Sequence, residues 1–237
     1  LAELFTKATK DEIGKLCYLL QGRVVPLYEP VEFGMADKLV IRAIARAYDK
    51  NHEDVTKVFK RIGDLGIAAQ ECHTGNKPHF AKATRGKGDS GELNVSRVYE
   101  ALRQVADESG EGSQEKKITL LADLLSAVDA LSARYIARIP LDKLRLGFSD
   151  MTILDALSWT LKGDKSLRSR LEEVYNIRPD IGLLAENVKE HGIAGLSHVK
   201  IIVGAPILAS LCQRLPTADE MIKKMGKVAV EPKWDGV

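Results

Sequence analysis

Residues 9–22, TKDEIGKLCYLLQG, carry the signals that begin, extend and end a helix. Thr9 and Glu12 form a capping box, in which each side chain satisfies a backbone N–H that the first helical turn leaves unpaired. Apolar residues then recur every three or four positions as far as Leu20, and Gly22 ends the pattern. The stretch therefore predicts an amphipathic α-helix with one buried face.

The same combination of caps, helical spacing and terminating glycine recurs along most of the chain. The low aromatic content of 5% argues against an all-β fold. We therefore predict an all-α domain over residues 1–226. Beyond the helix that begins at Thr9, helices are predicted at residues 35–48, 54–62, 64–71, 95–105, 113–128, 152–162, 167–174, 181–191 and 217–225.

Composition limits the classes of function. The chain has 237 residues, 45% of them hydrophobic, which is enough to build a core and excludes a disordered protein. The formal net charge of +2 means that an anionic partner must be held by local patches. The three cysteines lie far apart and predict free thiols in a reducing compartment, with no metal site. With no signal peptide and no membrane-length apolar stretch, we expect an intracellular protein, cytoplasmic or nucleoid-associated, or nuclear in a eukaryote.

The periodicity changes after residue 226. Val228 and Val230 alternate with less apolar residues and predict a β-strand. The sequence EPKWDG comes directly after it, at residues 231–236. A lysine at the end of a strand becomes a nucleophile when its pKa is lowered, and a nearby glycine lets the backbone approach a ligand closely. We therefore predict that residues 227–237 begin a second, truncated domain.

EPKWDG is similar to the nucleotidyltransferase motif of ATP-dependent DNA ligases of the archaeal and eukaryotic replicative type, whose lysine becomes adenylylated. Two upstream segments resemble the helical DNA-binding domain of the same ligases: SGEGSQEK at 109–116, and KLRLG at 143–147 running into MTILDAL at 151–157. VGAPI at 203–207 is a weaker match. An ordered set of segments is far more specific than any one motif.

The resemblance implies the chemistry of the intact enzyme, which would seal nicks in duplex DNA with ATP and Mg²⁺. Lys233 would attack the α-phosphate of ATP and form lysyl-AMP. Glu231 would contact adenine, while Asp235 and Gly236 would shape the turn that presents Lys233. The 237-residue fragment, which would lack most of the adenylation domain and the OB-fold domain, is expected to bind DNA without ligating it.

The resemblance also implies contacts to the DNA backbone and minor groove that read no sequence. Gly112 and Ser113 precede a helix whose first N–H groups suit a phosphate. Basic side chains and further glycine turns would complete the contacts. The expected set is Gly112, Ser113, Lys116, Lys117, Lys143, Arg145, Gly147, Gly204 and Pro206. For each, the alternative is ordinary capping, a plain helix start or a solvated charged face.

Two features depart from the family or extend it. Asp142 stands where the family usually has glycine, and places a negative charge beside an expected phosphate contact. The chain also stops one residue short of the family's arginine after the motif. The loop 74–92 contains Lys77-Pro-His-Phe80, a poor version of a motif with which related ligases dock on the sliding clamp. A flexible loop with no partner is the favoured alternative.

Two other classes of function remain open at this point. A helical protein-interaction scaffold with an incidental KWDG would expose a large apolar groove and bind no nucleic acid. Another covalent nucleotidyltransferase, such as an RNA ligase or a capping enzyme, would account for the surroundings of Lys233. It would not account for the segments at 109–116 and 143–147.

Overall fold

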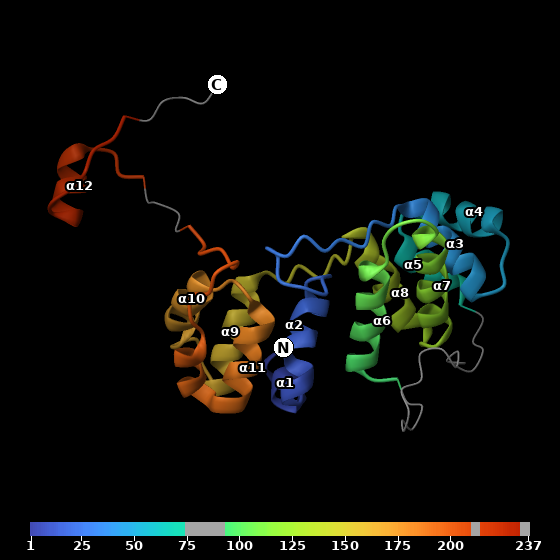
Figure 1. The fold of residues 1–237 in the computed structure, drawn as a ribbon, viewed down its shortest axis with the longest axis horizontal. Helices are drawn as coiled ribbons and strands as arrows, with labels where there is room; N and C mark the ends of the chain where they lie inside the picture. Colours follow the sequence, from blue (N-terminus) through green and yellow to red (C-terminus); the bar gives the residue numbers. More distant parts are fainter. Residues whose placement is uncertain (74–92, 210–213, 233–237) are drawn as a thin grey trace.

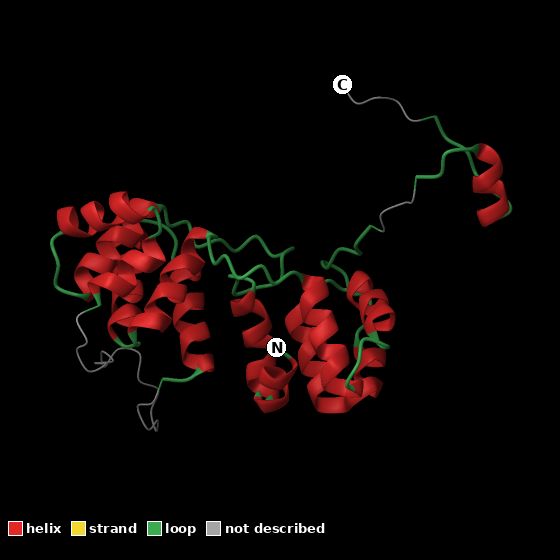
Figure 2. Cartoon of the chain, turned by 180° about the vertical axis from the view of Figure 1, so that it is seen from behind, coloured by secondary structure: helices red, strands yellow, loops and turns green. Residues whose placement is uncertain are grey.

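The computed structural model describes residues 1–73, 93–209 and 214–232, and within these ranges contains helices, turns and coil but no strand (Figure 2). The prediction of an all-α fold is confirmed. The helices are α1 (Ala2–Lys7), α2 (Lys10–Leu20), α3 (Asp37–Ala47), α4 (His52–Ile62), α5 (Leu65–Cys72), α6 (Val95–Asp107), α7 (Ser113–Ser126), α8 (Ala130–Arg138), α9 (Asp150–Lys162), α10 (Arg168–Ile177), α11 (Ile181–His191) and α12 (Ala218–Met225), with 3₁₀ turns η2 (Ile139–Leu141) and η3 (Gly192–His198). None of these described helices is both long and apolar enough to cross a lipid bilayer.

Local capping explains most helix starts. The Glu12 carboxylate accepts a hydrogen bond from the backbone N–H of Thr9 at 3.1 Å and another from its hydroxyl at 2.8 Å. The Thr217 hydroxyl caps α12 as predicted. Two predicted caps are wrong, because Ser149 and not Thr152 caps α9, and Gly112 and not Ser113 caps α7. The helices predicted to begin at residues 35 and 54 begin at Asp37 and His52.

The helices pack into two lobes, each with its own apolar core (Figure 1). Lobe I consists of α3 to α8, around buried residues such as Ile44, Leu102 and Leu121. Lobe II consists of α1, α2, α9 to α11 and η3, around residues such as Phe5 and Leu157. Helix α2 of lobe II packs against α6 of lobe I and joins the two.

The coils that connect the lobes gather at one edge of the molecule. The chain passes from lobe II to lobe I after α2 and returns before α9. Both crossings, the loop between α6 and α7, and the coil after η3 lie along the upper edge in Figures 1 and 2. We call this surface the loop edge; it consists of residues 23–36, 108–112, 142–149 and 199–209.

The strand predicted from Val228 and Val230 is wrong. Residues 228–232 form coil, and Val230 is exposed. A strand needs a partner strand to satisfy its backbone N–H and C=O groups, and no described segment pairs with this one. Helix α12 stands apart from both lobes in Figure 1 and buries none of its residues. The domain boundary at residue 226 stays a prediction.

Candidate nucleic-acid interface

The start of α7 is open and rich in backbone donors. Gly110 and Gly112 have φ of +83° and +75°, in the left-handed region that favours glycine, and a Cβ at either would meet no atom within 4 Å. Gly112 is the N-cap, Ser113 is the first helical residue, and no side chain caps this end. The N–H of Ser113 donates to the carbonyl of Gly110 at 3.2 Å, so the N–H groups of residues 114 and 115 and the positive end of the helix dipole remain for an anion.

The two lysines of this helix start have different environments. The Lys116 side chain is 64% exposed and pairs with Glu108 at 3.4 Å. Lys117 is only 7% exposed, and its ammonium donates to the backbone carbonyl of Phe33 at 2.5 Å. Lys117 thus holds the coil 23–36 against α7 instead of reaching the surface, and we remove it from the expected contact set. Its spacing of four residues from the core residue Leu121 is the sequence signal for this burial.

The segment 142–147 has an unusual backbone. Asp142, Arg145 and Gly147 have φ of +54°, +58° and +70°. Glycine adopts this conformation most readily, and aspartate does so more readily than most other residues, so position 142 accepts either. Arginine gains no such local support, and a left-handed backbone costs it about 1–2 kcal/mol. Leu144 is buried, so it anchors the segment between its two basic neighbours.

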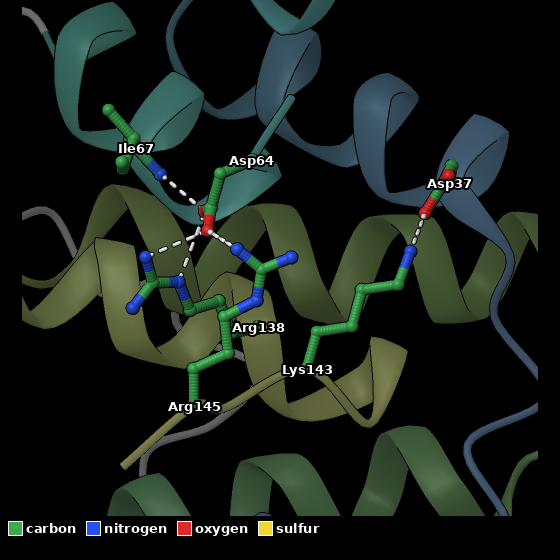
Figure 3. Close-up of polar contacts among 6 residues, drawn as sticks. All are labelled: Asp37, Asp64, Ile67, Arg138, Lys143 and Arg145. Atoms are coloured by element: carbon green, nitrogen blue, oxygen red, sulfur yellow. Dashed lines mark hydrogen bonds and ion pairs between the residues drawn. The ribbon is translucent and has the colours of Figure 1, made fainter. Parts of the chain in front are cut away.

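Both basic side chains of this segment are exposed and paired with carboxylates (Figure 3). The Lys143 side chain is 51% exposed, and its ammonium lies 3.2 Å from Oδ1 of Asp37. The Arg145 side chain is 61% exposed, and its Nη1 lies 3.3 Å from Oδ2 of Asp64. The Lys143–Asp37 pair is exposed on both sides, and such a pair contributes about 0–1 kcal/mol, so a phosphate would displace or join it at little cost. The Arg145 pair differs, because its Asp64 carboxylate is buried.

Asp64 is a residue that the sequence reasoning missed as part of this surface. It caps α5 by accepting the N–H of Ile67, and it forms two hydrogen bonds with the buried Arg138. Burial by itself would raise the pKa of Asp64, but the bonds from Arg138 and the backbone outweigh it and lower this pKa. An aspartate directly before a helix signals an N-cap, but that signal does not reveal its arginine partners.

The segment around Gly204 and Pro206 forms coil after η3, so the alternative of a plain helix start is wrong. Gly204 has φ of +92° and open space around it. The backbone N–H of Leu208 donates to the carbonyl of Asn176 at 2.8 Å, which ties this coil to the end of α10. A phosphate cradle at this position stays a prediction.

The fold brings together residues that the sequence separates. The start of α7, the segment 142–147 and the coil with Gly204 and Pro206 lie along the loop edge (Figure 1). Of the EPKWDG motif, Glu231 is described and exposed, whereas Lys233, Asp235 and Gly236 lie outside the described residues. Residues 74–92, with the expected clamp-docking motif, lie outside them as well. Within the described ranges, no group of three His, Cys, Asp or Glu side chains is placed to hold a metal ion.

Comparison with known proteins agrees with the resemblance seen in the segments. A family described as DNA ligase N terminus matches residues 1–158. The whole chain is 41% identical to a probable DNA ligase of Dictyoglomus turgidum, and covers 38% of that protein. It is 41% identical to DNA ligase 2 of Thermofilum pendens over its whole length, and 37% identical to DNA ligase 1 of Methanosarcina barkeri over 96% of its length, covering 39% of each.

The matched region bears on the alternatives. Residues 1–158 lie well before the EPKWDG motif, so the family match does not depend on it. A resemblance confined to the surroundings of Lys233, as an RNA ligase or a capping enzyme would have, does not account for this match. The chain spans less than two fifths of the length of these curated relatives. From its matched region and its relatives, the chain belongs to the DNA ligase family and corresponds to the N-terminal part of its members.

Proposed function

We propose that this chain is the part of a DNA ligase that holds nicked duplex DNA, and that the loop edge is its contact surface. One observation carries the proposal. Segments predicted from separate parts of the sequence, with exposed cations and open glycine turns, lie along the same edge of the fold (Figure 1). The names of the relatives support DNA as the substrate of the intact protein.

The mode of binding follows from the groups present. Ammonium, guanidinium and backbone N–H groups suit phosphate oxygens, which are the same for every base pair. Contact through the backbone and minor groove would therefore not read sequence. The proposed contacts are the start of α7 with Gly112, Ser113 and Lys116, the segment with Lys143, Arg145 and Gly147, and the coil with Gly204 and Pro206.

For the intact enzyme, we propose nick sealing through a lysyl-AMP intermediate on Lys233, with ATP as the source of AMP. Residues 227–237 would begin the adenylation domain, with Glu231 at adenine and with Asp235 and Gly236 shaping the turn. Mg²⁺ would neutralise phosphate charge during attack. Residues 1–237 alone are expected to bind DNA but not to ligate it.

Binding of a nicked duplex by this chain should weaken steeply with salt. Three exposed cations, Lys116, Lys143 and Arg145, would each replace condensed counterions on the DNA. The slope of log affinity against log salt should then be about −2.7, or about a fortyfold loss from 50 to 200 mM. Fluorescence anisotropy with a fluorescein-labelled nicked duplex measures both quantities.

A matched pair of lysine variants tests the surface itself. Lys116→Ala should reduce the slope by about one, because one phosphate contact is lost. Lys7→Ala removes an exposed lysine from α1, away from the loop edge, and should leave the affinity unchanged. Absence of wild-type binding at low salt, or an affinity that salt does not alter, would contradict the proposed function.

Removal of the negative charge at position 142 should strengthen DNA binding. Asp142 is exposed and lies next to Lys143, within the proposed contact segment. Asp142→Asn keeps a side chain that accepts the left-handed backbone, so the fold should not change. We expect about threefold higher affinity for the nicked duplex and an unchanged melting temperature. Glu3→Gln, an exposed charge removal in α1, is the control; equal affinities for the two variants would place Asp142 outside the contact.

A further inference from the structure

The Asp64 carboxylate lies between two guanidinium groups of very different exposure (Figure 3). The buried Arg138 donates to both of its oxygens, from Nε to Oδ1 at 3.0 Å and from Nη2 to Oδ2 at 2.8 Å. The exposed Arg145 donates from Nη1 to Oδ2 at 3.3 Å. Because Asp64 also accepts the N–H of Ile67 at 3.0 Å, α5 and α8 together hold it in place. It is a rigid anchor rather than a mobile surface charge.

The charges of this cluster leave Arg145 available to an anion. Arg138 neutralises Asp64, so the positive charge of Arg145 is not cancelled. A guanidinium has five N–H donors in a planar fork. One of them binds Asp64, which leaves others for an acceptor on the solvent side. Arg145 is therefore able to bind Asp64 and a phosphate oxygen at the same time. A lysine ammonium suits this arrangement less well, because it is a compact charge without a planar fork of donors.

We propose that Asp64 is a positioning residue for DNA binding: it holds the Arg145 guanidinium at the loop edge, so that the remaining N–H donors meet a backbone phosphate. This inference rests on the proposed function of the loop edge. A long side chain that is ordered before binding loses less conformational entropy when the ligand arrives. The buried Leu144 and the left-handed backbone of Arg145 fix the base of the same side chain.

A double-mutant cycle with an uncharged replacement of the buried pair tests this role. Asp64→Ser combined with Arg138→Met removes both charges, so the net charge does not change and no buried charge is left unpaired. Serine also retains a cap for α5. With the labelled nicked duplex at low salt, we expect the affinity to fall about fivefold in this pair variant and about tenfold in Arg145→Ala. The triple variant should bind no more weakly than Arg145→Ala alone.

Each other outcome of the cycle overturns the inference. Wild-type affinity in the pair variant would mean that Arg145 needs no anchor, and tighter binding would mean that the carboxylate competes with phosphate. If the pair substitution lowers DNA affinity equally in the wild-type and the Arg145→Ala backgrounds, the loss comes from a general change in structure and not from Arg145. If the wild-type chain binds no DNA, the proposed function fails and this inference fails with it. If the wild-type chain binds DNA in a salt-dependent way but the double-mutant cycle shows no coupling, the proposed function stands and only this inference fails.

A second pair of variants leaves the buried residues intact and decides the question if the pair variant does not fold. Arg145→Lys keeps the charge but loses the fork, so it should lose nearly as much affinity as Arg145→Ala. Arg61→Lys, at an exposed arginine of α4 that pairs with Glu71 outside the loop edge, should bind within about twofold of wild type. Wild-type affinity for Arg145→Lys would show that charge alone is required, and would overturn the positioning role.

Discussion

Replacing Gly66 by alanine is expected to lower the free energy of unfolding by about 3 kcal/mol. Gly66 lies in the first turn of α5, which packs closely against α8. A Cβ at this position would lie 2.4 Å from the backbone oxygen of Arg134 and 2.7 Å from Cγ and Nε of Arg138. The first obstacle is helix backbone, and the second is held by Asp64. The two helices must therefore separate, which strains the buried ion pair between them.

Thermal unfolding followed by circular dichroism measures this loss, which should lower the melting temperature by about 9 °C. Gly14→Ala is the matched control. The Cβ at Gly14 would meet the carboxylate end of Glu186, a partly exposed side chain that rotates away. Alanine also favours a helix over glycine by about 1 kcal/mol, so this control should remain within about 1 kcal/mol of wild type. Equal stability of the two variants would mean that α5 and α8 are not held at this spacing.

Replacing Lys233 by alanine in the full-length protein is expected to abolish the transfer of label from α-labelled ATP to the protein. Lys233 lies outside the described residues, and the expected loss follows from its chemistry. Formation of lysyl-AMP requires a deprotonated amine that attacks phosphorus, and an alanine methyl group has no nucleophilic atom. Nick sealing would be lost as well, whereas binding of a nicked duplex through the loop edge should persist.

Lys227→Ala controls for the loss of a lysine near the same motif. Lys227 is exposed and precedes the motif, so this variant should label as the wild type does. Denaturing electrophoresis with autoradiography detects the covalent label, and anisotropy measures DNA binding in the same preparations. Labelling that persists in Lys233→Ala would place the nucleophile at another residue. Loss of DNA binding in that variant would show that the substitution disturbs more than the chemistry.

Several helix starts were predictable because a side chain makes the cap, although the caps that Ser149 makes for α9 and Asp129 makes for α8 were not predicted. Thr9, Asp180 and Thr217 each accept or share a hydrogen bond within three residues, and such contacts depend on nearby sequence alone. Ser113 was predicted as the cap of α7, but it is the first helical residue, and Gly112 caps the helix with a left-handed backbone and no side-chain hydrogen bond. The strand after residue 226 failed for another reason, since strand formation depends on a distant partner.

Candidate contacts were predictable as residue types but not as surface positions. Lys116 and Lys117 are adjacent in the same basic helix start, yet one is exposed and the other binds the carbonyl of Phe33 inside lobe I. The left-handed backbone of Arg145 has no sequence signal, because arginine gives no local support to that conformation. Its contact with Asp64 joins residues 81 positions apart.

The order of residues along the chain is enough to assign most of the helices, though not α1 or α8, together with the all-α class and the resemblance to DNA ligases. Caps, periodicity and motifs act over a few neighbouring positions. Packing of α5 on α8, and of α7 on the coil 23–36, determines which cations reach solvent. It also determines that the buried Asp64 accepts a hydrogen bond from the exposed Arg145. Burial and ion pairing depend on contacts between distant segments, and such contacts exist only once the two lobes have formed.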